Sequence, residues 1–318
     1  MRSTAAFVLA LVVGVALYPY AIGVLARAGA GQQVSAYAPA SHRVKMRTPT
    51  MGGIGFCVLA ALAWVVLDRG RDGFVAVFAI AAGAGLGALD DLANVRGLGA
   101  LGLIARQKLA GQAGIGLLVG IGLDVAGETR QVIPGFGAPD LGWAIVPLTV
   151  LAVLAASNAV NLTDGVDGLC ATVAAISLAT LWALAAHAQA VGASVVAAAL
   201  LGGVLAFLAY NWWPARVFMG DTGSLALGCG LVVLAAEVRL LWLLPILGIV
   251  FVAETLSVVI NVTAITRFGR RVFLASPLHH HFEEKGIRER RLVVTFGAAA
   301  VVAAAVCAWI AVPAGVGA

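Results

Sequence analysis

Long apolar runs recur along the whole chain and are separated by short polar segments. A helix needs roughly 20 mostly apolar residues to cross a bilayer, and the pattern predicts ten such spans. They lie at residues 4–26, 50–67, 74–90, 107–123, 142–158, 169–187, 190–209, 222–237, 240–265 and 292–312. We therefore predict an all-α membrane protein with ten transmembrane helices, forming a single domain over residues 1–318.

Two local features refine this pattern. The first apolar run follows Arg2 and begins like a signal peptide, but it continues to residue 24 without a clear cleavage site, so we predict a retained first helix. The segment 124–141 is rich in turn-forming residues and predicts a hairpin between two spans. These residues are Pro134, Gly135, Gly137 and Pro139.

The composition excludes a soluble domain. Hydrophobic residues make up 62% of the 318 residues and charged residues only 11%, with a mean hydropathy of +1.02. The net charge of +5 fits loops that face anionic lipid headgroups and not a nucleic-acid partner. The cysteines stand apart in apolar runs, which predicts buried thiols and not a disulfide or zinc site. They are Cys57, Cys170, Cys229 and Cys307.

The basic residues are distributed unevenly over the loops. One set of alternating loops, counted to the adjacent helix ends, carries 15 of the 20 Lys and Arg residues. These loops are 27–49, 91–106, 159–168, 210–221 and 266–291. The positive-inside rule places them in the cytoplasm, which puts both chain termini outside.

Two adjacent carboxylates, Asp90 and Asp91, end the third predicted span on that face. Carboxylates at a membrane boundary are costly unless a positive group lies nearby. A divalent metal, or a role as a base toward an acidic substrate, would explain them. A solvated helix end is the alternative.

A polar series lies at residues 158–168, just after the fifth span. Asn158, Asn161, Asp164 and Asp167 recur every three residues, a spacing that gathers them on one helical face. The intervening glycines allow a phosphate to approach closely. A structural role alone explains such a cluster poorly, so a binding site is favoured.

A bent loop at 211–224 leads into the eighth span. Asp221 lies where that span begins, so it is an N-cap, a metal ligand, or both. Phe218 and the tryptophans before it are interfacial anchors or stack on a base.

Three consecutive histidines, His279 to His281, stand in a basic loop before the last span. They cannot all point one way, which argues against a three-histidine metal site. Histidine can instead donate to a phosphate or carbonyl oxygen.

Two further signals are weaker. Lys45, Thr48 and Thr50 precede paired glycines at a helix start, which suits a phosphate but also occurs at ordinary loop-to-span junctions. Glu254 lies inside the ninth span, where an ionisable residue indicates function by default. A paired structural carboxylate is the alternative.

These motifs, in this order, resemble those of the polyprenyl-phosphate N-acetylhexosamine-1-phosphate transferase superfamily, and within it the phospho-N-acetylmuramoyl-pentapeptide transferase family. The matching stretches are 48–53, 90–91, 102–112, 158–168, 211–224 and 277–286. The run PLHHHFE, which begins at Pro277, is the most specific of them.

The resemblance implies a bacterial enzyme of the inner (cell) membrane with a cytoplasmic site and Mg²⁺ as its cofactor. Its substrates would be UDP-N-acetylmuramoyl-pentapeptide and undecaprenyl phosphate, and its products lipid I and UMP. The bilayer is a further partner, and a homodimer is left open.

The resemblance also implies roles for single residues. Catalytic roles fall to Asp90, Asp91, Asp164 and His279, and magnesium ligation falls to Asp221 and Asn161. Contacts to either substrate fall to Lys45, Thr50, Arg106, Lys108, Asn158, Asn161, Asp167, Asn211, Phe218, Ser224, Glu254, His280 and His281.

Two positions depart from the family pattern. Asn94 stands three residues after Asp91, where a lysine is common. Either a phosphate contact is lost, or Arg96, Arg106 or Lys108 replaces it. Glu284 stands where an apolar residue is usual.

The implied reaction brings two anions together, because an oxygen of the lipid phosphate must attack the β-phosphorus of a diphosphate. A single displacement with Asp90 or Asp91 as base is expected, and a two-step route through an aspartyl-phosphate is the alternative. The competing functions are a sister transferase that uses UDP-N-acetylglucosamine, a transporter and a membrane scaffold. The carboxylates cluster at one membrane face and no repeat is visible, which disfavours a transporter.

Overall fold

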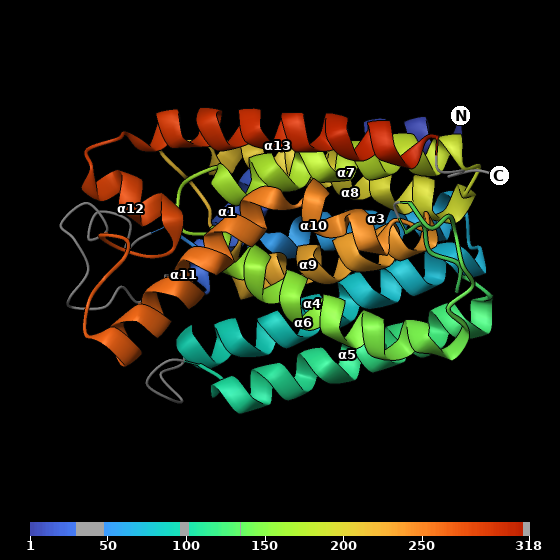
Figure 1. Ribbon diagram of the computed structural model, residues 1–318. Coiled ribbons are helices and arrows are strands. Elements are labelled where there is room, and N and C mark those ends of the chain that lie inside the picture. The colour runs from blue at the N-terminus through green and yellow to red at the C-terminus, as the bar shows by residue number, and fades with distance from the viewer. Residues whose placement is uncertain (30–47, 96–101, 134, 314–318) are drawn as a thin grey trace.

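A computed structural model describes residues 1–29, 48–95, 102–133 and 135–313 of the chain (Figure 1). Over these residues the protein is helical, with turns, loops and two isolated β-bridges between the helices. The elements are α1 (Arg2–Arg27), α3 (Gly53–Leu67), α4 (Arg71–Val95), α5 (Ala105–Ala126), η2 (Gly142–Ala144), α6 (Ile145–Thr163), α7 (Leu169–His187), α8 (Val191–Asn211), α9 (Gly220–Glu237), η3 (Leu241–Leu243), α10 (Leu244–Leu247), α11 (Ile249–Phe268), α12 (Leu278–Glu284) and α13 (Glu289–Ala311).

Eight of the described helices are long and apolar enough to cross a membrane, which makes the chain an integral membrane protein. They are α1, α4, α5, α6, α7, α8, α11 and α13. The 15-residue α3 and the polar-ended α9 fall outside this set. Each predicted span overlaps a helix, so the all-α prediction is confirmed, whereas ten membrane crossings stay a prediction. The beginning of α1 and the end of α13 lie at the same end of the bundle (Figure 1); the side of the membrane that the termini face also stays a prediction.

The prediction of one continuous helix over 240–265 was wrong. The chain instead forms η3, α10 and α11 in succession. Pro245 stands in the first turn of α10, where its missing N–H is tolerated, and Gly248 separates α10 from α11 with φ −93° and ψ 28°. After this break α11 runs obliquely away from the bundle (Figure 1).

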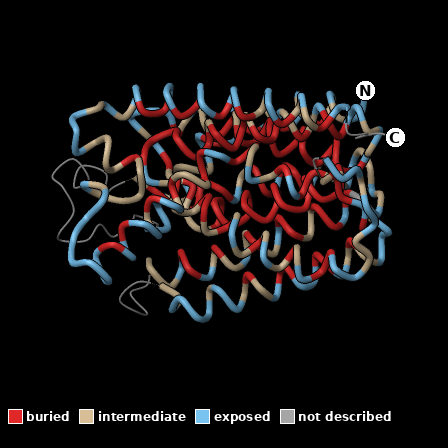
Figure 2. The backbone as a smooth tube through the Cα atoms, in the orientation of Figure 1, coloured by how far each residue is buried: buried red, intermediate tan, exposed pale blue. Residues whose placement is uncertain are grey.

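Helices α8 and α9 form the centre of the bundle. Every residue of α9 from Thr222 to Glu237 is buried, and α9 packs against α3, α4 and α6. Buried residues are concentrated in the middle of the bundle, whereas exposed residues lie along outer helices such as α5 and α13 (Figure 2). A Cβ atom on Gly87 would lie 2.1 Å from the Asp221 carbonyl oxygen, so α4 and α9 meet backbone to backbone beside the acidic residues.

Two smaller predictions are confirmed, and a third stays a prediction. The segment 124–141 contains antiparallel bridges between Arg130 and Asp140 and between Ile133 and Gly137, as a hairpin requires. The first apolar run forms α1, which packs against α3 and α8, and its retention stays a prediction. All four cysteines are buried and unbridged.

Candidate active site

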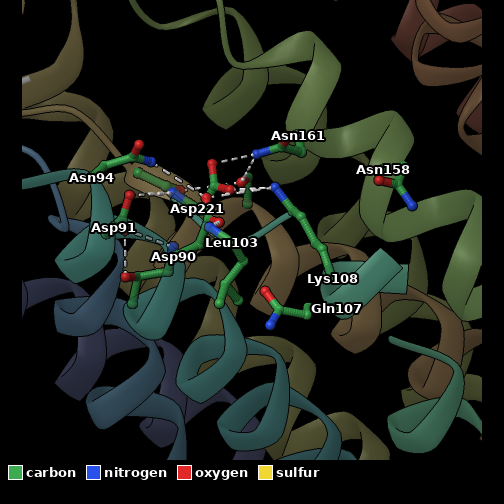
Figure 3. A network of polar contacts seen from close by, with 12 residues as sticks. Asp90, Asp91, Asn94, Leu103, Gln107, Lys108, Asn158, Asn161 and Asp221 are labelled. Carbon is green, nitrogen blue, oxygen red and sulfur yellow. Dashed lines mark hydrogen bonds and ion pairs between the residues drawn. The ribbon is translucent and has the colours of Figure 1, made fainter. Parts of the chain in front are cut away.

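Asp91 anchors the start of α9 (Figure 3). Its carboxylate accepts hydrogen bonds from the backbone N–H groups of Asp221 (3.1 Å) and Thr222 (2.9 Å) and from the Thr222 hydroxyl (2.6 Å). A negative group at a helix N-terminus accepts hydrogen bonds from the free N–H groups and is attracted by the positive end of the helix dipole. Asp91 is therefore the side chain that caps α9. The interpretation of Asp221 as the N-cap was wrong, because Asp221 lies inside the first turn.

Asp90 points to different partners, because adjacent residues of a helix diverge by about 100°. Its carboxylate accepts a 2.8 Å hydrogen bond from the Leu103 N–H and a 3.5 Å contact from the Asn94 amide. The Lys108 ammonium lies 3.9 Å away. The Asp90 side chain is only 7% exposed, so the protein removes it from water, and Lys108 is the cation near it among the described residues.

Asp221 completes the acidic cluster, which comprises Asp90, Asp91, Asp221 and the Lys108 ammonium. Lys108 binds one carboxylate oxygen of Asp221, and the amide of Asn161 donates to the other at 2.7 Å (Figure 3). Within the described residues, Lys108 thus contacts two carboxylates of the cluster, and the third, Asp91, lies beside them at the start of α9. Carboxylates that share a site repel one another unless a cation or a proton intervenes, so the cluster is suited to binding a cation.

Magnesium fits this donor set. Mg²⁺ prefers oxygen ligands and usually takes only one or two carboxylates, completing its shell with water and substrate phosphates. Asp221 and Asp90 can supply carboxylates on either side of Lys108. The amide nitrogen of Asn161 donates to Asp221 and to the Ser224 hydroxyl (2.9 Å), which leaves the amide oxygen as a further ligand. Within the described residues, no group of three His, Cys, Asp or Glu side chains is already arranged around one point.

Asn158 lies apart from the acidic cluster (Figure 3). Its amide donates to the side-chain oxygen of Gln112 and to the Leu154 carbonyl, both at 2.8 Å. Gln112 is fully buried, and its amide nitrogen has no partner. Sequence reasoning missed Gln112, although a glutamine inside an apolar span is a signal of the kind that drew attention to Glu254.

The 158–168 series does not share one helical face, contrary to the prediction. Helix α6 ends at Thr163, so Asp164 is its C-cap and Asp167 lies in the following loop. Asp164 is half-buried. Burial, followed by the negative charges of Asp221, Asp91 and Asp167, raises the pKa of Asp164 from its ordinary 3.8 to about 7. The loop therefore brings a fourth acid into the electrostatic range of the acidic cluster.

Asp167 and Asn211 hold the bent loop that precedes α9. Asp167 accepts a 3.0 Å hydrogen bond from the Ala215 N–H. Asn211 accepts from the Gly168 N–H and donates to the Val217 carbonyl. Both side chains are buried, and their hydrogen bonds fix the backbone of the loop in this structure.

The loop before α9 also pairs with the segment before α3. The Phe218 N–H donates to the Pro49 carbonyl, and the Gly52 N–H donates to the Phe218 carbonyl. Gly220 has φ +72°, and a Cβ atom there would lie 2.8 Å from the Thr50 hydroxyl oxygen and 2.6 Å from an Asp91 oxygen. Thr50 is thus placed at the acidic cluster, and Phe218 is half-buried beside it.

Arg106 and Lys45 are the other two basic residues that were predicted to contact a substrate. Arg106 is exposed at the start of α5, two residues before Lys108. Lys45 lies outside the described residues.

The histidine cluster comprises Glu254 on α11 and His279, His280 and His281 on α12. One oxygen of Glu254 accepts from the His279 backbone N–H and contacts its Nδ1 atom, both at 3.2 Å. Their side chains are 0% and 1% exposed. Glu254 is thus a paired carboxylate in this structure, as the alternative interpretation stated. The paired Glu254 can hold Nδ1 protonated, which leaves Nε2 of His279 as the free ring atom.

The other two histidines point elsewhere, as expected for consecutive residues. His280 pairs with Glu283 at 2.6 Å, and His281 accepts a 3.1 Å hydrogen bond from the Leu274 N–H. His279 meets the loop of the polar series: a Cβ atom on Gly165 would lie 2.4 Å from its Nε2 atom. The loop beginning at Asp164 therefore lies between the acidic and histidine clusters.

An apolar groove of about 270 Å³ lies between α6, α9, α10 and α11. Its lining includes Ala155, Leu231, Pro245, Phe251 and Leu256. Ala159 and Val160 also line it, so the groove reaches the residues that directly precede Asn161.

The sequence is similar to known proteins over almost its whole length. A family model described as glycosyl transferase family 4 matches residues 73–239. The chain is 44% identical over 312 residues to the phospho-N-acetylmuramoyl-pentapeptide-transferase of Desulforudis audaxviator, covering 92% of this chain and 91% of the relative. Relatives of the same name from Moorella thermoacetica and Heliobacterium modesticaldum are 43% and 40% identical, with 93% and 97% of this chain covered and 95% and 97% of theirs. The chain therefore belongs to glycosyl transferase family 4 and, within it, to the phospho-N-acetylmuramoyl-pentapeptide-transferases.

Proposed function

We propose that this chain transfers phospho-N-acetylmuramoyl-pentapeptide from its UDP-linked donor to undecaprenyl phosphate, with lipid I and UMP as products. The observation that carries the proposal is the acidic cluster, in which Asp90 and Asp221 contact Lys108 and Asp91 holds the backbone of Asp221. Such a cluster suits a reaction between two phosphates that needs a cation. The name shared by relatives at 40–44% identity supports the choice of donor.

The proposed setting is the inner membrane of a bacterium, with ten crossings, both termini outside and the acidic cluster at the cytoplasmic face. The distribution of Lys and Arg supports this orientation. Both substrates then reach one site, since the nucleotide arrives from the cytoplasm and the lipid from the bilayer.

Asp221 and Asn161 are the proposed magnesium ligands, with Asp90 on the opposite side of Lys108. Bound magnesium would neutralise diphosphate charge and stabilise the leaving UMP. Lys108 then turns from Asp221 toward the transferring phosphate, where its ammonium opposes the repulsion between the two anions. Arg106 and Lys45 are the remaining proposed substrate contacts of basic charge.

Asp90 is the proposed base. Asp91 is engaged by three donors of α9, whereas Asp90 has one short backbone contact and faces Lys108. In the proposed step, Asp90 takes the proton of the lipid phosphate, whose freed oxygen attacks the β-phosphorus of the donor. The bond from that phosphorus to the UMP oxygen breaks, and UMP leaves with the electron pair. Atoms and charges balance without another reactant.

The remaining residues are proposed to position the donor. Asp164, Thr50 and Ser224 border the acidic cluster, Asn158 extends the polar surface to Gln112, and Phe218 offers a ring for the uracil. Asp167 and Asn211 act by holding the loop that carries Phe218. His279 is proposed to meet the sugar-diphosphate through Nε2, flanked by His280 and His281, and Glu254 acts by orienting it.

The apolar groove beside α6 is the proposed place of the polyprenyl chain. It is lined by alkyl and aromatic side chains and ends next to Asn161. A chain lying there would bring its phosphate to the acidic cluster without leaving the bilayer.

Release of UMP tests the proposal directly. The purified chain, given Mg²⁺ and undecaprenyl phosphate, is expected to release UMP from UDP-N-acetylmuramoyl-pentapeptide and not from UDP-N-acetylglucosamine. The reverse preference would make it a sister transferase. In a second experiment the donor carries a labelled β-phosphate and the lipid is omitted. Trapping of a labelled aspartate would replace the single displacement by a two-step route.

A further inference from the structure

Helix α11 presents a long apolar surface that continues beyond its last turn. Its exposed apolar residues are Leu256, Val259, Ile260, Val262 and Ile265. The surface continues with Phe268, Val272 and Leu274, which are 71%, 56% and 52% exposed. Since α11 is one of the spans, exposed apolar side chains are present both on this span and on the loop after it.

Three arginines lie among these apolar residues. Arg267, Arg270 and Arg271 are all exposed. None of the three forms an ion pair within the part of the chain that the structure describes, and Arg271 donates only to the Leu274 carbonyl (3.2 Å). The segment therefore combines unpaired positive charge with exposed apolar side chains.

Hydrogen bonds to side chains fix the backbone of this segment. The side-chain oxygen of Asn261 accepts from the N–H groups of Val272 (3.0 Å) and Phe273 (3.1 Å). The Leu274 N–H donates to Nδ1 of His281. Fixed in this way, the segment cannot turn its apolar side chains inward, so their exposure is a property of the fold.

We propose that residues 267–274, the α11 foot, bind anionic phospholipid headgroups at the bilayer surface. Aromatic and aliphatic side chains are stable at the interface. Arginine pairs with phosphate through charge-assisted hydrogen bonds and is attracted to an anionic leaflet. A lipid surface is favoured over a soluble acidic partner because the apolar surface of the foot continues that of a membrane span.

The foot is also connected to the histidine cluster. Asn261 and Glu254 stand on the same helix, and His281 joins Leu274 to α12. Headgroups held by the foot therefore fix the end of α11 against which α12 rests.

Binding of a fluorescent phosphatidylglycerol to the full chain in neutral detergent tests the foot, without reference to transferase activity. The variant has Arg267→Gln, Arg270→Gln and Arg271→Gln together. The matched control has Arg69→Gln, Arg71→Gln and Arg130→Gln, away from the foot. We expect affinity to fall on the order of a hundredfold in the foot variant and to stay within twofold of the parent in the control. Unchanged affinity in the foot variant, or equal loss in both, would overturn the proposal.

A second measurement covers the case in which the foot variant does not fold. A nitroxide at Leu274→Cys reports depth by its relative collision rates with oxygen and with a water-soluble nickel complex, and the native cysteines are buried away from the label. In vesicles of phosphatidylglycerol and phosphatidylcholine we expect the label at the level of the phosphates. A label fully in water would overturn the proposal and would point to a soluble partner.

Discussion

The acidic cluster and the histidine cluster balance their charges in opposite ways. In the acidic cluster, among the residues that the structure describes, Lys108 is the cation that pairs with Asp90 and Asp221, and Asp91 has no ion pair. In the histidine cluster each carboxylate has an imidazole of its own: Glu254 pairs with His279 and Glu283 with His280.

This difference indicates where the chemistry takes place. The acidic cluster has excess negative charge that a cation and the substrates must offset, so it is incomplete without them. The histidine cluster satisfies most of its donors and acceptors internally, so its main effect is to fix positions. Substitutions in the first should reduce the rate of the chemical step severely, and those in the second should have milder effects.

Asp221→Asn is expected to have the largest effect. It keeps the size of the side chain but removes the charge that contacts Lys108 and is proposed to bind magnesium. We expect magnesium-dependent UMP release to fall on the order of a thousandfold. The control is Asp124→Asn, which removes a carboxylate at the opposite end of α5 from Lys108. This variant should release UMP at the parent rate. Retained activity in Asp221→Asn would remove this carboxylate from the metal site.

The paired aspartates should separate in their effects. Asp90→Asn removes the proposed base and is expected to slow turnover about a hundredfold, with thermal stability close to that of the parent. Asp91→Asn removes a charged helix cap and is expected to lower stability by about 1–2 kcal/mol. A thiol-reactive dye measures this, because it reports unfolding through the buried cysteines. Equal stability of the two variants would contradict the division of roles.

Much of this arrangement could be predicted from the sequence, because the physical cost of the residues is visible there. Apolar runs of membrane length located the helices, and carboxylates at span ends located the polar face. The break at Gly248 was missed because α10 and α11 are equally apolar, so hydropathy does not mark the change of direction.

The partners of the site residues were harder to predict. A spacing of three does not match the helical repeat of 3.6 residues, so successive members rotate by about 60°. Asn158 consequently reaches Gln112, while Asn161 reaches Asp221. The cap on α9 comes from Asp91, 130 residues earlier in the chain, and no local pattern encodes that contact.

Glu254 tests whether the histidine cluster acts by positioning. Glu254→Ala removes the acceptor for the His279 ring and backbone, and we expect about a tenfold loss of turnover, the effect of one hydrogen bond of about 1.4 kcal/mol. Glu254→Gln keeps an acceptor oxygen and should recover most of this loss. Glu284→Ala, at an exposed position on the same short helix as His279, is the matched control. If Gln is as harmful as Ala, the charge of Glu254 matters and a purely positioning role is excluded.

The smallest effect concerns Asp164, whose loop lies between the two clusters. Because burial and the neighbouring acids raise its pKa to about 7, the folded protein retains a proton that the unfolded chain releases near pH 4. The stability that this proton contributes is complete below pH 3.8 and declines until the pH reaches about 7. Without magnesium, the melting temperature of the parent should therefore fall more between pH 5 and pH 8 than that of Asp164→Asn, by roughly a few degrees. Added Mg²⁺ at pH 8 should reduce the difference, because a cation offsets the repulsion among the carboxylates. Parallel melting curves for parent and variant would show that Asp164 does not feel the acidic cluster, and the loop would then belong with the histidine cluster alone.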